Sequence, residues 1–183
     1  MSHIASITAG IYTSIAFNPT AVASVSAGDT STELIAMFAT APTVIANVRE
    51  FPVLGTPANI VNVPVYGKKT SVQVQGQADA PTMEFTLNYV PADTVELQAL
   101  VGNGQLYAFQ VAMCSQAPAN LQQVAATGIG VAVNTIPTNN TVFNFLGKFE
   151  SFLVTPSLSD SIQAKLTLSM QTQLFGPFTY ASA

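Results

Sequence analysis

The sequence contains few charged residues. Asp, Glu, Lys and Arg make up 8% of its 183 residues, against about 25% in an ordinary soluble domain. No charged residue lies between Glu96 and Lys148, and none precedes Asp29 apart from the titratable His3. A soluble monomer normally carries interspersed charges over its surface. These stretches therefore predict a surface that is hidden in contacts with other molecules, or that faces something it must not bind.

Basic residues are especially scarce. Five Lys and Arg residues stand against nine Asp and Glu residues, and the formal net charge is −4. Only Lys68 and Lys69 are adjacent. A protein that holds nucleic acid must neutralise phosphates with clusters of Lys and Arg. This composition therefore argues against specific nucleic-acid binding.

Cysteine and histidine occur once each, and tryptophan is absent. Cys114 alone allows no intrachain disulfide, which agrees with synthesis and assembly in a reducing cytoplasm. His3 stands near the terminus, so a serine or cysteine nucleophile would have no credible base. Metal sites need clusters of His, Cys and carboxylates, and the sequence shows none. We therefore expect a protein that is not an enzyme, with no catalytic residues, no cofactor and no metal.

Long apolar runs are also missing. Ile4 to Phe17 is apolar but interrupted by serine and threonine, and no Lys or Arg precedes it. Val124 to Val133 is too short to cross a bilayer as a helix. Neither segment reads as a signal peptide or a membrane span, so we expect no membrane association.

The most informative segment that is present runs from Val72 to Val101. Apolar and polar residues alternate before and after a turn at Gly76 to Pro81, as in strands with one buried face. The pattern predicts a hairpin of Val72–Gln75 with Met83–Tyr89.

A short helix is predicted directly after this hairpin. Pro91 ends the strand, Asp93 can cap a helix with Glu96 as its capping-box partner, and Gly102 supplies a left-handed stop. These residues predict a helix over Asp93–Val101.

A second hairpin is predicted just before, from Asn59–Tyr66 and Thr70–Gln75. Pro64 cannot donate a hydrogen bond to a neighbouring strand, so this hairpin is expected at a sheet edge or as a protruding arm. Lys68 and Lys69 at its tip discourage random pairing of strand edges.

Further strands are predicted on both sides of an irregular segment. Gln105–Met113 and Ile162–Met170 alternate, and between them the apolar phase of Val142–Val154 slips near Glu150, which predicts a β-bulge. Residues 115–140 are interpreted as a loop insertion that allows a short strand at Val131 and Val133.

The N-terminal third is less clearly patterned. Residues 1–42 are interpreted as an arm or peripheral element, with a strand over Ile11–Phe17 as an equally good interpretation. Thr30 and Glu33 can open a short helix that ends before Pro42. A strand over Thr43–Arg49 and a loop up to Ala58 follow.

Several of these pieces together resemble a known family. They are the turn Gly76-Gln77-Ala78-Asp79, the strand Met83–Pro91, the helix Asp93–Val101, the strand Gln105–Met113, and the pair within Phe143–Met170 with Gly147 inside one long strand. Over roughly residues 43–170 this pattern resembles the tail tube proteins of long-tailed bacteriophages, a fold shared with bacterial secretion tubes. The predicted fold is a single all-β domain over residues 1–183 with one short helix, built as two packed antiparallel sheets or a half-open β-barrel.

The resemblance implies a structural role in the virion. Its members assemble in the host cytoplasm into stacked hexameric rings that form a hollow tube for the genome. Implied partners are sister copies, the tail terminator, the tape-measure protein and distal tail proteins, with DNA passing without specific binding. An extended hairpin at this place in the family reaches the neighbouring ring, which assigns an inter-ring contact to Tyr66, Gly67, Lys68, Lys69 and Thr70.

The polar faces of the strands suggest a lining for such a tube. A lumen should hold few cations, because each one would bind DNA phosphates. We therefore assign a lumen-facing role to the polar side chains of the two central strands, Ser71, Gln73, Gln75, Glu84 and Thr86.

An alternative of another class is a carbohydrate- or receptor-binding β-sandwich on a virion or secreted protein. Such sites usually need exposed aromatic side chains beside convergent polar groups. The absence of tryptophan weighs against this alternative.

Overall fold

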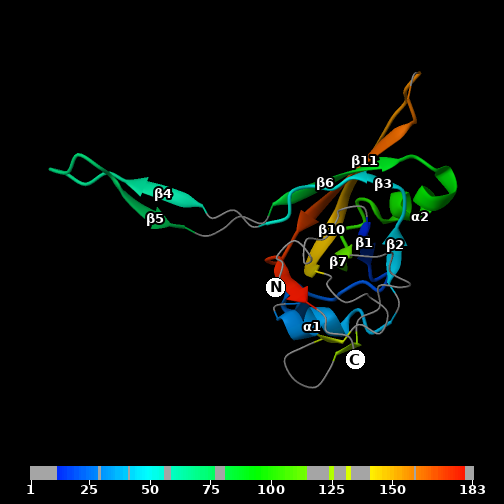
Figure 1. Ribbon diagram of the computed structural model, residues 1–183, viewed down its shortest axis with the longest axis horizontal. Helices are drawn as coiled ribbons and strands as arrows, with labels where there is room; N and C mark the ends of the chain where they lie inside the picture. The colour runs from blue at the N-terminus through cyan, green and yellow to red at the C-terminus, as the bar shows by residue number, and fades with distance from the viewer. Residues whose placement is uncertain are drawn as a thin grey trace, which may run out of the picture.

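The structure is a computed structural model that describes residues 12–28, 30–40, 42–55, 59–76, 81–114, 124–125, 131–132, 141–158 and 160–179. Strands dominate it (Figure 1). In chain order the elements are β1 (Tyr12–Phe17), η2 (Val25–Gly28), α1 (Ser31–Ala36), β2 (Thr43–Ile45), β3 (Val48–Glu50), β4 (Ile60–Val63), β5 (Val72–Gln75), β6 (Thr82–Asn88), α2 (Pro91–Leu100), β7 (Tyr107–Cys114), β8 (Val124–Ala125), β9 (Val131–Ala132), β10 (Thr141–Thr155), β11 (Gln163–Met170) and β12 (Phe175–Thr179).

The main sheet is antiparallel and strongly curled. Its strand order is β2-β1-β7-β10-β11-β6-β3, and β12 pairs with β10. In a flat sheet the two edge strands would lie about 29 Å apart, at six spacings of about 4.8 Å. Yet only Ala46 and Asn47 separate β2 from β3, and three Cα steps span at most about 11 Å. The sheet must therefore curl until its edges approach each other, which agrees with the half-open barrel among the expected architectures.

Strand β10 is the longest element and is shared by both halves of this sheet. Its first part pairs with β7 and its second part with β11. The register with β11 shifts between Phe149 and Ser151, so the bulge predicted near Glu150 is confirmed. Gly147 lies where a Cβ atom would come within 2.8 Å of the Ser169 carbonyl oxygen and 3.3 Å of the Phe109 ring. The close approach of these strands explains the glycine inside a long strand.

One apolar core fills the inside of the curl. Its aromatic centre consists of Phe17, Tyr107, Phe109, Phe145 and Phe149, all buried. Helix α2 adds Leu97 to this core. The alternating apolar face predicted over Ile162–Met170 is confirmed for residues 164, 166, 168 and 170, which are all buried, whereas Ile162 precedes β11 and is exposed.

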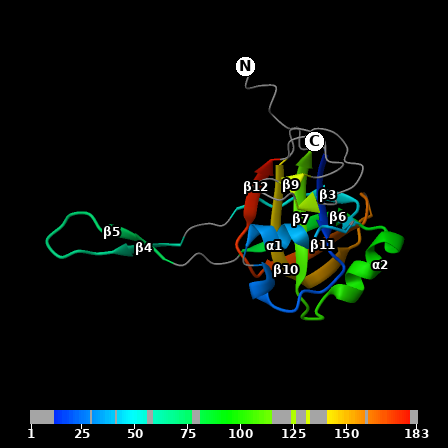
Figure 2. The same cartoon turned by 90° about the horizontal axis from the view of Figure 1, so that it is seen from below.

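Helix α1 covers the other face of the sheet (Figure 2). Leu34 and Phe38 pack there against Ala108 of β7 and Leu146 of β10. The predicted capping box at its start is confirmed: the Thr30 side chain accepts from the Glu33 backbone N–H, and the Glu33 carboxylate accepts from the Thr30 backbone N–H.

The N-terminal third differs in part from the expected peripheral arm. Strand β1 lies inside the main sheet, between β2 and β7, which agrees with the strand interpretation of Ile11–Phe17. The peripheral position therefore does not hold for residues 12–17, because Ile15, Ala16 and Phe17 are buried. The strand expected over residues 43–49 is divided into β2 and β3 at Asn47, whose φ of 61° interrupts an extended chain.

The hairpin predicted across residues 76–81 is wrong. Strand β5 pairs only with β4, whereas β6 pairs with β11 and β3. Val72 and Val74 are exposed, so β5 has no buried face within the described chain. Alternation predicts a strand but does not identify its partner, and the hairpin of β4 with β5, which was also predicted, satisfies the same pattern.

The start of the second helix also differs from the prediction. Helix α2 begins at Pro91, its N-cap is Val90, and no side chain caps it. Proline suits the first helical position because its φ is preset and no N–H is needed there. Asp93 therefore lies inside the first turn, where it accepts a hydrogen bond from the Asn47 side chain (2.7 Å). The positive φ of Gly102 agrees with the predicted stop.

Two further expectations concern the C-terminal half. The final strand pair was placed at residues 143–170, but β12 follows it and pairs with the first part of β10. Most of the predicted insertion 115–140 lies outside the described residues. Within it, β8 and β9 pair through two residues each, in agreement with a short strand at Val131.

Candidate assembly surfaces

The β4–β5 hairpin projects from the body as a two-stranded ribbon (Figure 1). All of its residues from Asn59 to Gln75 are exposed. An isolated two-stranded hairpin is at best marginally stable in water. This ribbon projects from the body with both of its faces uncovered. It therefore requires a partner surface to stabilise it.

One face of this ribbon consists of valines. Val61 lies opposite Val74 and Val63 opposite Val72, so all four side chains point to the same side. Between 41% and 51% of each residue is exposed. Completing the burial of a half-exposed valine contributes roughly 1 kcal/mol, so covering these four residues, here named the valine face, contributes roughly 4 kcal/mol. The opposite face carries Ile60 and three polar residues, Asn62, Gln73 and Gln75.

The tip of the ribbon holds the residues predicted to contact the next ring. Tyr66 and Gly67 form a turn closed by the Lys68 N–H bond to the Val65 carbonyl (3.2 Å), and Gly67 has a φ of 79°. Tyr66 is fully exposed at 105%. Among the described residues, Lys68 and Lys69 have no ion-pair partner. Tyr66, Gly67, Lys68, Lys69 and Thr70 thus lie together at the end farthest from the body.

A polar surface follows β6 and β11 on the outside of the curled sheet. Register brings Glu84 opposite Thr167 and Thr86 opposite Lys165. The Lys165 ammonium forms an ion pair with the Glu84 carboxylate (2.6 Å), which raises the pKa of Lys165. Thr86 donates to Glu50 of β3 (3.4 Å). This surface, here named the polar face, carries Glu50, Thr82, Glu84, Thr86, Gln163, Lys165, Thr167 and Ser169.

The residues predicted to line the lumen do not form one surface. Glu84 and Thr86 belong to the polar face, whereas Ser71, Gln73 and Gln75 lie on the projecting ribbon. The prediction joined them because it paired β5 with β6. The actual pairing of β5 with β4 carries the first group away from the body.

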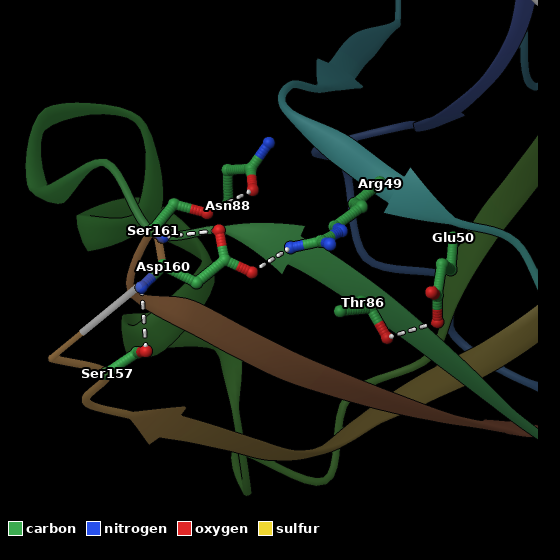
Figure 3. Close-up of polar contacts among 7 residues, drawn as sticks. All are labelled: Arg49, Glu50, Thr86, Asn88, Ser157, Asp160 and Ser161. Atoms are coloured by element: carbon green, nitrogen blue, oxygen red, sulfur yellow. Dashed lines mark hydrogen bonds and ion pairs between the residues drawn. The ribbon is translucent and has the colours of Figure 1, made fainter.

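A third surface lies at the end of the β10–β11 hairpin and was not predicted. Polar contacts tie its turn to the body (Figure 3): Arg49 forms an ion pair with Asp160 (3.1 Å), and Ser161 donates to Asn88 (3.1 Å). Within the turn the Asp160 N–H donates to Ser157. The Ser161 backbone N–H, with the Arg49 guanidinium, lowers the pKa of Asp160.

Apolar side chains are exposed around this anchored turn. Leu158 at its tip is fully exposed (109%), and Val95 on the adjacent helix α2 is 60% exposed. Ile162, whose carbonyl accepts the Tyr89 N–H, and the neighbouring Val90 are also exposed, and these four residues are here named the distal patch. Turns favour residues such as Pro, Ser and Asp, so an exposed leucine beside Pro156, Ser157 and Asp160 is unusual. This leucine is the feature of the sequence from which the patch could have been predicted.

No group of three or more His, Cys, Asp or Glu side chains that could hold a metal occurs among the described residues. His3 and the turn residues 77–80 lie outside them. Within the same ranges, no helix is long and apolar enough to cross a membrane.

Cys114 is buried at the end of β7, and desolvation raises the pKa of its thiol from 9.0 to about 11. The folded state therefore holds this proton more tightly than the unfolded state. The stabilisation is complete below pH 9, where both states are protonated, and is lost as the pH rises towards 11.

Denaturation between pH 8 and 11 tests this assignment. Compared with a Cys114→Ala variant, the native protein is expected to lose an additional 2–3 kcal/mol or so of unfolding free energy across that range. The alanine variant serves as the control because it keeps every other titrating group. Parallel pH curves for the two proteins would contradict a buried, protonated thiol.

Comparison with known proteins was made at the levels of sequence and structure. Neither a protein-family model nor a curated protein sequence matches the chain. Among solved structures it is similar to the SPP1 tail tube, determined by a hybrid of solid-state NMR and cryo-electron microscopy, with a TM-score of 0.55. The match covers 94% of this chain and 81% of that chain at 10% sequence identity. At that identity the similarity concerns the fold, and the chain has the all-β fold of a phage tail tube protein.

Proposed function

We propose that this protein is the repeating subunit of a phage tail tube, in which rings of sister copies, six to a ring, stack around a channel for the genome. The observation that carries the proposal is the fold similarity to the SPP1 tail tube over 94% of the chain. Other partners implied by such a tube are the proteins that end it and measure its length.

The uncovered surfaces give independent support. The projecting ribbon exposes four valines and a tyrosine that no described residue covers. Soluble monomers rarely leave large contiguous apolar patches in water. Self-assembly explains both the ribbon and the long stretches without charge.

We place the channel lining on the polar face. Its side chains are hydroxyls, amides and carboxylates, and its Lys165 is neutralised by Glu84. Few free cations there allow DNA to slide without phosphate binding. Ser71, Gln73 and Gln75 remain candidates for the lining only where the ribbon of one copy folds against the next ring.

Electron microscopy of the concentrated purified protein tests the proposal. Stacked rings or tubes with six-fold end views are expected, because the uncovered surfaces find partners only in sister copies. Discrete monomers at every concentration would contradict the proposal.

The same preparation tests the channel lining. A cysteine placed by Thr167→Cys is expected to react with a bulky polyethylene-glycol maleimide in the monomer and to be protected in tubes, whereas Val53→Cys on an exposed loop serves as the comparison. The native Cys114 is buried and does not interfere. Equal labelling of Thr167→Cys before and after assembly would place the polar face outside.

A further inference from the structure

We infer that the β4–β5 ribbon of one copy docks on the distal patch of the next copy, with its valine face against the exposed apolar side chains at the β10–β11 turn and helix α2. The inference rests on the proposed function, since it names the surface that receives the ribbon. Leu158 and Val95 are the central residues of the receiving surface, at 109% and 60% exposure.

The two surfaces cannot meet within one molecule. Figures 1 and 2 show the ribbon on one side of the body, and the β10–β11 turn and α2 on the other. A contact between different patches at opposite ends is head-to-tail, and such contacts repeat into rings or filaments. One pair of surfaces therefore suffices to extend an assembly without limit.

Their chemistry is complementary in two respects. Both surfaces are apolar, and neither is covered by a described residue. The ribbon tip adds Lys68 and Lys69, while α2 exposes Asp93 and Glu96 and has no basic residue. Opposite charges at the rim of an apolar contact fix its register and exclude wrong partners.

The polar face is a poor alternative receiver for the ribbon. It presents hydroxyls, amides and charged side chains to a row of valines, and its Lys165 would face the lysines of the tip. Burying those polar groups without new hydrogen bonds is costly.

The receiving turn is held in place before binding. Arg49 bonds Asp160, and Ser161 bonds Asn88, so the turn that presents Leu158 is tied to β3 and β6 (Figure 3). A surface that is already ordered loses less entropy on association. This advantage accounts for the several polar contacts that fix the position of the exposed turn.

A charge-exchange experiment tests the pairing. The ribbon variant Lys68→Glu/Lys69→Glu and the helix variant Asp93→Lys/Glu96→Lys are each expected to raise the concentration needed for assembly by about tenfold or more. All four changes in one chain are expected to restore assembly to within a few-fold of the native protein. Because negative charge in the first turn stabilises a helix, thermal melting of each unassembled variant checks that α2 is intact.

Disulfide trapping provides a second measurement that needs no charge reversal. Separately purified Tyr66→Cys and Val95→Cys proteins are mixed under oxidising conditions, and a crosslinked dimer is expected. Val53→Cys replaces Val95→Cys in the control, because Val53 is also an exposed valine but lies outside the distal patch. Slow or absent crosslinking is expected there.

The outcomes separate this inference from the function on which it rests. Tubes that form normally with either charge-reversed pair, or crosslinks to Val53→Cys as fast as to Val95→Cys, overturn the docking site but leave the tube subunit in place. Failure of the fourfold variant to recover, with α2 intact, also overturns the pairing. A native chain that never assembles but binds an unrelated protein through the distal patch overturns both.

Discussion

Phe109→Ala is expected to lower the free energy of unfolding by roughly 3–5 kcal/mol, the usual cost of truncating a buried phenylalanine. Phe109 is fully buried, and its ring lies 5.2 Å from Phe145, 5.1 Å from Phe149 and 6.2 Å from Phe17 between centroids. The ring also fills the space above Gly147, where no side chain can replace it. Alanine would therefore leave a cavity between three rings and lose three aromatic contacts.

Urea unfolding of the unassembled protein measures this effect. Phe109→Leu retains most of the volume and is expected to cost clearly less, while Tyr66→Ala removes a fully exposed aromatic ring and is expected to change the unfolding free energy by under about 0.5 kcal/mol. A loss below about 1 kcal/mol for Phe109→Ala would show that the core of the curled sheet collapses to fill the gap. The aromatic cluster would then not be the centre of the fold.

Much of the sheet could be predicted because local sequence periodicity determines local structure. Strand β11 shows strict alternation over eight residues, and its burial follows that alternation residue by residue. The phase slip after Phe149 predicted the bulge in β10, since only an extra residue can move an apolar set to the other side of a strand. Helix α1 was identified by its capping box, a purely local signal.

Partners of strands were predicted only in part: the hairpin of β4 with β5 is confirmed, whereas the predicted pairing of β5 with β6 is wrong. Strand β5 alternates like a half-buried strand, but no described part of the chain covers its valines. Alternation encodes which face is apolar and carries no information about what covers it. The early start of α2 was missed for a different reason: Pro91 was interpreted as the end of a strand, although it is also the best first residue of a helix.

The candidate surfaces show the same difference between local features, which could be predicted, and features that depend on strand pairing, which could not. The turn at Tyr66 to Thr70 was located because a turn between two strands is a local feature, whereas its role in contacts between rings was implied by the family resemblance and stays a prediction. The polar face and the distal patch depend on strands brought together by the curl, so the sequence could not separate Gln73 from Glu84 or relate Leu158 to Val95. The exposed leucine in the turn and the valines of the uncovered ribbon suggest a pair of contact surfaces only because the structure places them at opposite ends of the body.

Removal of the ribbon is expected to abolish assembly while leaving the body folded. The Gly76 N–H donates to the Asn59 carbonyl (2.7 Å), so the two ends of the ribbon already lie side by side. Replacing residues 60–75 by Asn-Gly, a two-residue hairpin turn, closes the chain without strain. No residue of the ribbon belongs to the core, so the unfolding free energy of the monomer is expected to change by under about 0.5 kcal/mol.

A milder variant separates the effect of the ribbon's presence from the effect of its apolar side chains. Replacing Val61, Val63, Val72 and Val74 by threonine keeps the β-branched shape and the strand preference but removes the apolar face. Assembly, measured by sedimentation and microscopy, is expected to fail with this variant as it does with the deletion, whereas Asn62→Thr/Gln73→Thr on the other face is expected to assemble. Tubes that form from the deleted protein would remove the ribbon from the assembly altogether, and a body that melts without it would make the ribbon part of the fold. Loss of tubes with a stable monomer, produced by four hydroxyl-for-methyl exchanges, identifies the valine face as the surface that joins the copies.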